Sequence, residues 1–392
     1  MNRKAQLSTK ILKILLERGT LTRQEFAACT GARPATILEA VNELKKKGII
    51  AEPGRSGKKT GRKSPQLKLN PNYFWSVGID FQVKKTIGTI INAEGEPIAE
   101  TTRPAHERSS LKECRREIAE VIRELKAQIF PNIDKINAIG FSDPGMVDTK
   151  TGVSLRAVNV PGWENVNTAE WLRHEFKLPS FIFSAESIKT YMEYQSRLLD
   201  PPKSMFHMGT DDGIGGGFIK NGELFSGSFH RAMEVGHIVI VPDGPICQCG
   251  NRGCLEALAG ESGILRRIDE ALVNGVDTCL VTENFSIAHF AECAEHDKMA
   301  KIIAAEICGY LGSALAVIAT LLNPELIVIS GGLASLGTVL PETISRVLAQ
   351  NCFPGTIKDL KLEISKLPAN AVARGAALLA RNQIIGGDSV SY

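Results

Sequence analysis

An abrupt change in charge near residue 70 constrains this chain more than any other feature of its sequence. Residues 1–70 hold 16 Lys and Arg against 5 Asp and Glu, a net charge of +11, whereas the remainder carries −8. A basic segment ahead of an acidic body predicts two parts, of which only the first has a polyanion as its partner. A solvated basic tail would carry the same charge, but the regular apolar pattern of this segment argues against it.

The basic segment shows the pattern of three short helices. Its apolar residues fall at helical spacing in three runs: before Gly19, after the capping box formed by Thr22 and Glu25, and before Gly48. A turn at Thr30-Gly31 separates the second helix from the third. Such a turn ahead of a third helix is typical of a helix-turn-helix, in which that helix lies in the major groove of DNA.

The third helix carries the residues that we expect to contact DNA. Arg33 and Thr36 lie at its N-terminal end, and Asn42, with Glu39, lies further along. Short strands at 49–51 and 66–69 flank a basic, glycine-rich loop, in which Arg62 is placed to enter a minor groove. Residues 1–70 therefore predict a winged helix-turn-helix that binds a double-stranded DNA operator. The alternative is a three-helix protein-interaction module, against which the basic loop argues.

From residue 74 onward, strand-like and helix-like segments alternate, which is typical of α/β layers. We expect two lobes, at 71–190 and 191–392, with a cleft between them and the C-terminal helix returning to the first lobe. A long amphipathic helix is predicted at 111–130. Strands are predicted at 75–80, 86–92, 136–141, 181–183, 204–208 and 326–329.

The cysteines indicate a metal rather than a disulfide framework. The polar N-terminus has no signal-peptide pattern, and the longest apolar run, at 311–322, is too short to span a bilayer, so we expect a cytoplasmic protein. Three of the nine cysteines are crowded together, at Cys247, Cys249 and Cys254. In a cytosolic chain such crowding favours metal binding.

Several motifs of the body resemble those of the ROK family of sugar kinases and repressors, a branch of the actin-like ATPase fold. The resemblance covers residues 74 to about 385 and is most specific where a Glu-x-Gly-His segment precedes a Cys-x-Cys-Gly-x-x-Gly-Cys-x-Glu segment. The winged helix ahead of this body resembles the repressor branch of the family. The motifs lie at Pro144–Asp148, Asn159–Trp163, Gly213–Gly217, Glu234–His237, Cys247–Glu256, Ser330–Gly332 and Ala373–Ala377.

The two cysteine-linked segments supply one imidazole and three thiols for a metal. His237, Cys247, Cys249 and Cys254 suit tetrahedral Zn²⁺, and the resemblance implies the same four ligands. Because four protein ligands leave no position for a water molecule, we expect the zinc to be structural. Buried thiols without metal are the alternative.

The resemblance also implies a sugar site at Asn159, Glu234, His237 and Glu256. His237 can serve both sites, with one ring nitrogen on zinc and the other facing the sugar. We expect a monosaccharide or a derivative of one. A sugar phosphate is a second hypothesis, because Ala185 in place of the family's Asp removes a negative charge from the cleft and Lys189 is close by in sequence. The resemblance further implies a homodimer, which would match a two-fold operator.

The departures from the family concern phosphate transfer. The kinases carry Asp-x-Gly-x-Thr on a phosphate-binding turn, where this chain has Gln82 and Lys84 after Asp80. They carry Asn-Asp ahead of a helix, with the Asp as general base, where this chain has Ser184-Ala185. We therefore expect no catalytic residues and a sugar-responsive transcription regulator. The alternatives are an active ATP-dependent sugar kinase with a DNA-binding appendage, and a regulator controlled by a protein partner.

Overall fold

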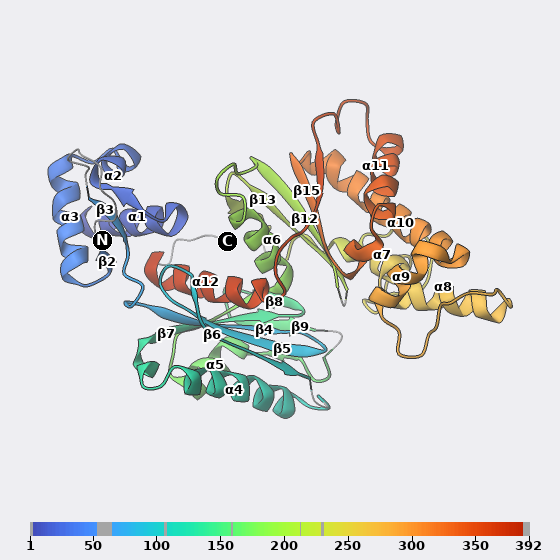
Figure 1. Cartoon of the computed structure of the whole chain (residues 1–392), viewed down its shortest axis with the longest axis horizontal. Coiled ribbons are helices and arrows are strands. Elements are labelled where there is room, and N and C mark those ends of the chain that lie inside the picture. Colours follow the sequence, from blue (N-terminus) through green and yellow to red (C-terminus); the bar gives the residue numbers. More distant parts are fainter. Residues whose placement is uncertain are drawn as a thin grey trace. The chain divides into compact units, whose positions relative to one another are not determined.

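The computed structural model describes residues 3–52, 65–105, 108–157, 160–211, 213–228 and 231–386. Its chain forms two compact units (Figure 1). The first contains Met1–Ala185 and Ala369–Ser391, and the second contains Glu186–Pro368. The basic head therefore belongs to the same unit as the sheet that follows it, and the C-terminal helix also lies in that unit.

The head has the helices that the sequence predicts and one strand that it does not. Both hydrogen bonds of the capping box between Thr22 and Glu25 are present, and Gly31 ends the second helix at a φ of 69°. The additional strand, β1, pairs with β3, which also pairs with β2, so the strand order is β1-β3-β2. Arg62 lies outside the described residues. The elements are α1 (Arg3–Arg18), β1 (Leu21–Thr22), α2 (Arg23–Thr30), α3 (Pro34–Lys46), β2 (Ile50–Ala51) and β3 (Gln66–Leu69).

A five-stranded sheet forms the centre of the first unit, in the order β11-β7-β4-β5-β6. α4 packs against one face, and α12 packs against the other so closely that a Cβ at Gly78 or Gly140 would collide with its backbone (Figure 1). A small sheet, β8 to β10, follows β7 in the chain. The bounds are β4 (Trp75–Phe81), β5 (Lys85–Ile91), β6 (Pro97–Pro104), α4 (Leu111–Gln128), η1 (Asn132–Lys135), β7 (Ile136–Asp143), β8 (Met146–Asp148), β9 (Val153–Arg156), β10 (Glu164–Val166), α5 (Thr168–Phe176), β11 (Ser180–Ser184) and α12 (Ala371–Gly386).

The second unit contains another five-stranded sheet, in the order β14-β13-β12-β15-β16. Its central strand β12 pairs antiparallel with β13 and parallel with β15, as β4 pairs with β5 and β7 in the first unit. The α/β body expected from the alternating pattern is confirmed. The bounds are α6 (Ala185–Gln195), β12 (Ser204–Thr210), β13 (Ile214–Lys220), β14 (Glu223–Leu224), η2 (Val235–His237), α7 (Leu255–Ala259), α8 (Glu261–Val273), α9 (Ile287–His296), α10 (Lys298–Leu322), β15 (Leu326–Gly331), η3 (Gly332–Leu336), α11 (Val339–Asn351) and β16 (Lys361–Ile364).

α10 is the main core helix of the second unit. It extends well beyond the apolar run at 311–322 and is long and apolar enough to cross a membrane by length and composition. However, most of its apolar window is buried inside the fold, where Ile303, Ile307 and Leu311 belong to the largest hydrophobic cluster. A buried core helix of a soluble protein meets the same test.

Candidate functional site

Four potential metal ligands come together in the second unit. His237 ends η2, Cys254 immediately precedes α7, and Cys247 and Cys249 lie in the loop between them. Their ligand atoms all lie within 4.8 Å of one another. The Sγ atom of Cys247 is 3.7 Å from His237 Nδ1, and the Sγ atoms of Cys249 and Cys254 are 3.7 Å apart. The structure thus groups the four residues that the sequence predicted.

Two glycines shape the loop that carries the thiols. Gly250 and Gly253 have positive φ values of 97° and 70°, and a Cβ at Gly253 would collide with the carbonyl oxygen of Val241. The amide of Gly250 donates to the carbonyl of Cys247 over 2.9 Å, which closes a tight turn. Because only glycine adopts this backbone without strain, both residues serve the geometry of the ligands.

The chemistry of this group fits a soft cation. Burial, together with the two neighbouring thiols, raises the pKa of Cys254 to about 12. The thiol would therefore stay protonated at neutral pH unless a cation stabilised its thiolate. Three sulfurs and one imidazole nitrogen are the donors that a tetrahedral zinc site uses. The residues that are present fit a metal ion.

Two of the predicted sugar-binding carboxylates lie on the elements that also carry metal ligands. Glu234 precedes η2, and Glu256 lies in the first turn of α7. Burial raises the pKa of Glu234. The carboxylates of Glu186 and Glu256 raise the pKa further, whereas His237 acts in the opposite direction. Glu256 Oε2 also accepts a hydrogen bond from the amide of Ile214 at the start of β13. Asn159, the remaining predicted sugar residue, lies outside the described residues.

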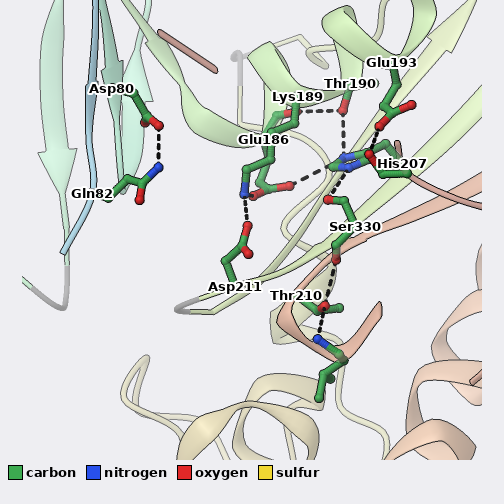
Figure 2. A network of polar contacts seen from close by, with 12 residues as sticks. Asp80, Gln82, Glu186, Lys189, Thr190, Glu193, His207, Thr210, Asp211 and Ser330 are labelled. Atoms are coloured by element: carbon green, nitrogen blue, oxygen red, sulfur yellow. Dashed lines mark hydrogen bonds and ion pairs between the residues drawn. The ribbon is translucent and has the colours of Figure 1, made fainter. Parts of the chain in front are cut away.

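A charged network lies beside the glycine-rich hairpin of β12 and β13 (Figure 2). The Nζ atom of Lys189 lies 2.7 Å from Glu186 Oε1 and 2.7 Å from Asp211 Oδ2. Burial disfavours the charged form of Lys189, but these two carboxylates outweigh burial and raise its pKa. The positive charge of Lys189 is thus already matched by two acidic side chains of the same unit.

The side chain of Glu186 occupies space that the hairpin glycines provide. A Cβ at Gly209 would collide with its carboxylate, and a Cβ at Gly215 would collide with its Cγ atom. Its Oε2 atom lies 3.6 Å from Nδ1 of His207. The side chain of Glu186 therefore lies against the hairpin backbone at two glycines, where the hairpin has no side chains of its own.

His207 connects this network to the neighbouring strand β15. The imidazole is fully buried, and its Nε2 atom lies 2.8 Å from the hydroxyl of Ser330 (Figure 2). Burial lowers the pKa of His207, against the opposing effect of Glu186. The hydroxyl of Thr210 donates to the carbonyl of Ser330 and accepts from the amide of Leu333. Side chains of β12 therefore link that strand to the end of β15 and to the residues that follow it.

The corresponding turn of the first unit, after β4, is fixed in another way. Gln82 Nε2 donates to Asp80 Oδ2 over 2.5 Å (Figure 2). The guanidinium of Arg108 donates to the carbonyls of Gln82 and Val83, and it forms a buried ion pair with Glu117 at 2.6 Å. Two carbonyl groups of this turn therefore accept hydrogen bonds from a side chain of the same unit.

The predicted DNA-contacting residues share an exposed face of α3. Arg33 precedes the helix, and Thr36, Glu39 and Asn42 follow at intervals of three residues, all of them exposed. The opposite face is buried and packs on the other helices of the head. Residues three apart lie on the same side of a helix, so these side chains project in one general direction.

The sequence interpretation did not identify the roles of Glu186, Arg108 and His207. The contact of Glu186 with glycines more than 20 residues away has no spacing signal in the sequence. Arg108 and Glu117 showed only the i, i+9 separation of a loop residue and a helix residue. The sole available signal for His207 was an imidazole within an otherwise apolar strand, at 204–208.

A helical head with a small sheet, joined to an α/β body that has two five-stranded sheets and a His-Cys cluster, defines a protein with an N-terminal module and a two-sheet body. The family model described as "ROK family" matches residues 76–383. The chain therefore belongs to the ROK family. The matched residues include both five-stranded sheets and the metal-ligand cluster, and they exclude the basic head.

The head distinguishes two groups of similar proteins. The xylose repressor of Caldicellulosiruptor bescii is 26% identical, with 93% of this chain and 92% of the repressor covered. A glucokinase of Halalkalibacterium halodurans is 27% identical, but only 79% of this chain is covered, against 96% of the kinase. A solved ROK family transcriptional regulator, a homologue of the Escherichia coli Mlc protein, has a TM-score of 0.84 at 24% identity, covering 98% of this chain and 97% of its own.

Proposed function

We propose that this protein is a sugar-responsive, DNA-binding transcription regulator, and most simply a repressor that its ligand releases from the operator. The observation that carries the proposal is the extent of similarity: repressors match the chain together with its head, whereas the glucokinase covers 79% of it. The exposed face of α3 supports DNA binding, because the N-terminal residues of such a helix contact base edges in the major groove.

Within the head, Arg33 and Thr36 are the proposed base-contacting residues, with Asn42 further along the same face. Arg62, in the basic loop between β2 and β3, is proposed to enter the minor groove. A homodimer would place two such heads on a two-fold operator. These roles belong to a cytoplasmic protein, as the partner is DNA.

For the sugar, the proposed contacts are Glu234, His237 and Glu256, together with Asn159. Carboxylate and imidazole groups can accept and donate to adjacent hydroxyls. The metal is proposed to be a structural Zn²⁺ on His237 and the three clustered cysteines, which would hold η2 and α7 together. It would shape the sugar site and leave the ligand to be bound by oxygen and nitrogen donors.

The charge distribution favours a neutral sugar over a sugar phosphate. Ala185 and Lys189 together suggest a negatively charged ligand in the sequence, but in the structure Lys189 pairs with both Glu186 and Asp211. A phosphate would have to displace one of these carboxylates, and Glu234 and Glu256 add further negative charge to the same unit. An uncharged monosaccharide, or a derivative of one, meets no such repulsion.

Phosphoryl transfer is not part of the proposed function. Transfer needs a base for the attacking hydroxyl and a cradle for the triphosphate. The methyl group of Ala185 accepts no proton, and Oε1 of the neighbouring Glu186 is engaged by Lys189. The carboxylate of Glu186 lies against Gly209 and Gly215, where it would repel phosphate oxygens. An active sugar kinase with a DNA-binding appendage remains the competing hypothesis.

The test begins with an operator selected by the purified chain from random duplex DNA. Binding, followed by fluorescence anisotropy, should weaken steeply with salt, since phosphate contacts release counterions. Arg33→Ala should lower affinity about tenfold and relax the preference at one base position. Arg266→Ala, a change at a half-buried surface position of the body, is the matched control. Binding that ignores salt, or no binding to any duplex, would contradict the DNA-binding role.

The ligand is tested separately on the same chain. Thermal stability should rise with one member of a panel of neutral hexoses, pentoses and N-acetylhexosamines, because a ligand that binds only the folded state stabilises it. The same sugar should change operator affinity, and Glu256→Gln should abolish both effects. Stabilisation by no sugar would favour control by a protein partner. Sugar-dependent ADP release at about 1 s⁻¹ or faster would favour the kinase.

A further inference from the structure

A second group of thiols and imidazoles lies on α9 and on the segment ahead of it. His289, Cys293 and His296 occupy positions i, i+4 and i+7 of that helix, so they share one face. Cys279 lies in the preceding segment, between α8 and α9. No residue of this group belongs to the cluster of His237 and the three crowded cysteines.

Two sulfur–nitrogen distances within this group are close to the spacing of neighbouring ligands around one ion. Cys293 Sγ lies 3.6 Å from His289 Nε2, and Cys279 Sγ lies 3.9 Å from His296 Nε2. Around a tetrahedral zinc ion, with Zn–S of about 2.3 Å and Zn–N of about 2.0 Å, neighbouring sulfur and nitrogen atoms are roughly 3.5 Å apart. Cys279 and Cys293 form a disulfide here, and their Cα atoms are 6.3 Å apart.

Cys279 is held beside α9 by contacts that do not depend on the disulfide. Its amide donates to Asp297 Oδ2 over 3.2 Å, and the hydroxyl of Thr278 donates to Asp297 Oδ1 over 3.0 Å. Leu280, the next residue, is buried in the core of the second unit. The segment would therefore keep Cys279 near His296 after the disulfide is reduced.

We propose that Cys279, His289, Cys293 and His296 form a second metal site when the two thiols are reduced. Two thiolates and two imidazoles are soft donors in a closed set of four, which suits Zn²⁺. In the oxidised form both sulfurs are bonded to each other and are unavailable to the ion. The same four residues thus have a metal-bound and a disulfide-bonded form, and in each form the segment after α8 is tied to α9.

A peroxide converts the metal-bound form to the disulfide-bonded form with balanced chemistry. The two zinc-bound thiolates lose two electrons in total and form the sulfur–sulfur bond, while the oxygen–oxygen bond of the peroxide breaks. Two protons are taken up, hydrogen peroxide leaves as two water molecules, and Zn²⁺ is released. Cys279 and His296 are exposed, so both the ion and the peroxide have access. Cys308 is not expected to react with peroxide in this way, because burial raises the pKa of its thiol to about 12.

The test counts zinc in the full-length protein. Protein reduced with a phosphine, equilibrated with Zn²⁺ and desalted should contain about two zinc ions per chain by elemental analysis. His289→Ala/His296→Ala should contain about one, with unchanged circular dichroism because both side chains reach solvent. Cys308→Ala, a matched change of a buried thiol, should retain about two. One zinc in the reduced wild-type protein, or two in the double variant, would overturn the proposal.

Peroxide provides an independent measurement on the same protein. A stoichiometric amount should release about one zinc per chain, together with an equal amount of Cys279–Cys293 disulfide in peptide mass spectrometry. The double variant should form the disulfide without releasing zinc. Zinc release without this disulfide would overturn the proposal. Cys249→Ser removes a ligand of the first cluster, so a remaining peroxide-sensitive zinc in that variant would assign it to the second site.

Discussion

The two five-stranded sheets share one strand pattern, but different side chains contact the first hairpin of each sheet. In the first unit, Gln82 donates to Asp80, and Arg108 donates to the carbonyls of the turn after β4. In the second unit the hairpin keeps Gly209 and Gly215, and the side chain of Glu186 covers them. The contacts of the first turn involve residues next to it in the chain or in the loop before α4, whereas those of the second hairpin involve a side chain from α6.

Removal of a metal ligand should have the largest effect on stability, and that effect should be confined to the second unit. Cys254→Ser should lower the stability of the second unit by at least about 4 kcal/mol, because metal binding is coupled to folding. Hydrogen exchange should show lost protection in β12, β13 and α7, and preserved protection in β4 and β5. Cys352→Ser, at a buried thiol outside the cluster, is the control. Equal losses in both units would contradict a metal requirement confined to one of them.

Arg108→Met should destabilise the first unit by about 3–5 kcal/mol, since it leaves the carboxylate of Glu117 buried without its cation. The expected change in urea unfolding and in hydrogen exchange lies in β4, β5 and α4. Combining it with Glu117→Leu should recover much of the loss. If Arg108→Met costs less than about 1 kcal/mol, the turn after β4 does not depend on this ion pair.

The two units should respond to pH with opposite signs. Burial raises the pKa of Asp143 in the first unit to about 6, from 3.8. The folded unit therefore binds this proton more tightly than the unfolded chain, and the resulting stability, on the order of 3 kcal/mol, is present below about pH 4 and lost as pH rises through 6. Burial lowers the pKa of His207 from 6.5, so its contribution is lost as pH falls below 6.5.

Protection factors measured between pH 4.5 and 7.5 check this difference. Asp143→Asn should flatten the pH dependence of β7, and His207→Gln should flatten part of that of β12. Protonation of the metal ligands acts on the second unit in the same direction as His207, so the comparison rests on the variants. A pH dependence that neither substitution changes would contradict both assignments.

The smallest expected effect concerns the covered hairpin. Glu186→Ala removes the carboxylate beside Gly209 and Gly215, while Lys189 keeps its pair with Asp211. We expect ATP binding, measured by calorimetry, to tighten about tenfold, or roughly 1.4 kcal/mol. Glu342→Gln, an exposed change on α11, is the control. ADP release should stay at background because Ala185 still provides no base. Unchanged ATP binding would mean that coverage by Glu186 is not what closes the hairpin.

Much of the fold was predictable because its signals are local. The capping box at Thr22 and Glu25, the helical spacing around Ile37 and Val41, and the apolar strand runs all depend on residues a few positions apart. β1 escaped prediction because two residues carry no periodicity, and it exists only through pairing with β3. The α/β layers followed from alternation, whereas the order of the strands comes from packing.

The candidate site was predictable where its residues are clustered in sequence. Three thiols and an imidazole within 18 positions are sufficient to predict a metal, because a shared ion is the main reason to crowd them. The contact between Glu186 and the glycines could not be predicted in this way. It depends on how the first turn of α6 lies against β12 and β13, and nothing in the sequence around Glu186 specifies that approach.

The hydrophobic cluster of the head has a consequence for how the protein can be divided. Ile11 and Leu15 of α1 share this cluster with Ala138 of β7 and with Ala380 and Ile385 of α12. A body truncated at residue 70 would expose that apolar surface to water. Such a fragment should be soluble only after the newly exposed apolar residues are replaced by polar ones. The head therefore completes one hydrophobic cluster of the first unit, and a chain without the head would need polar residues on the surface of α12 that the head now covers.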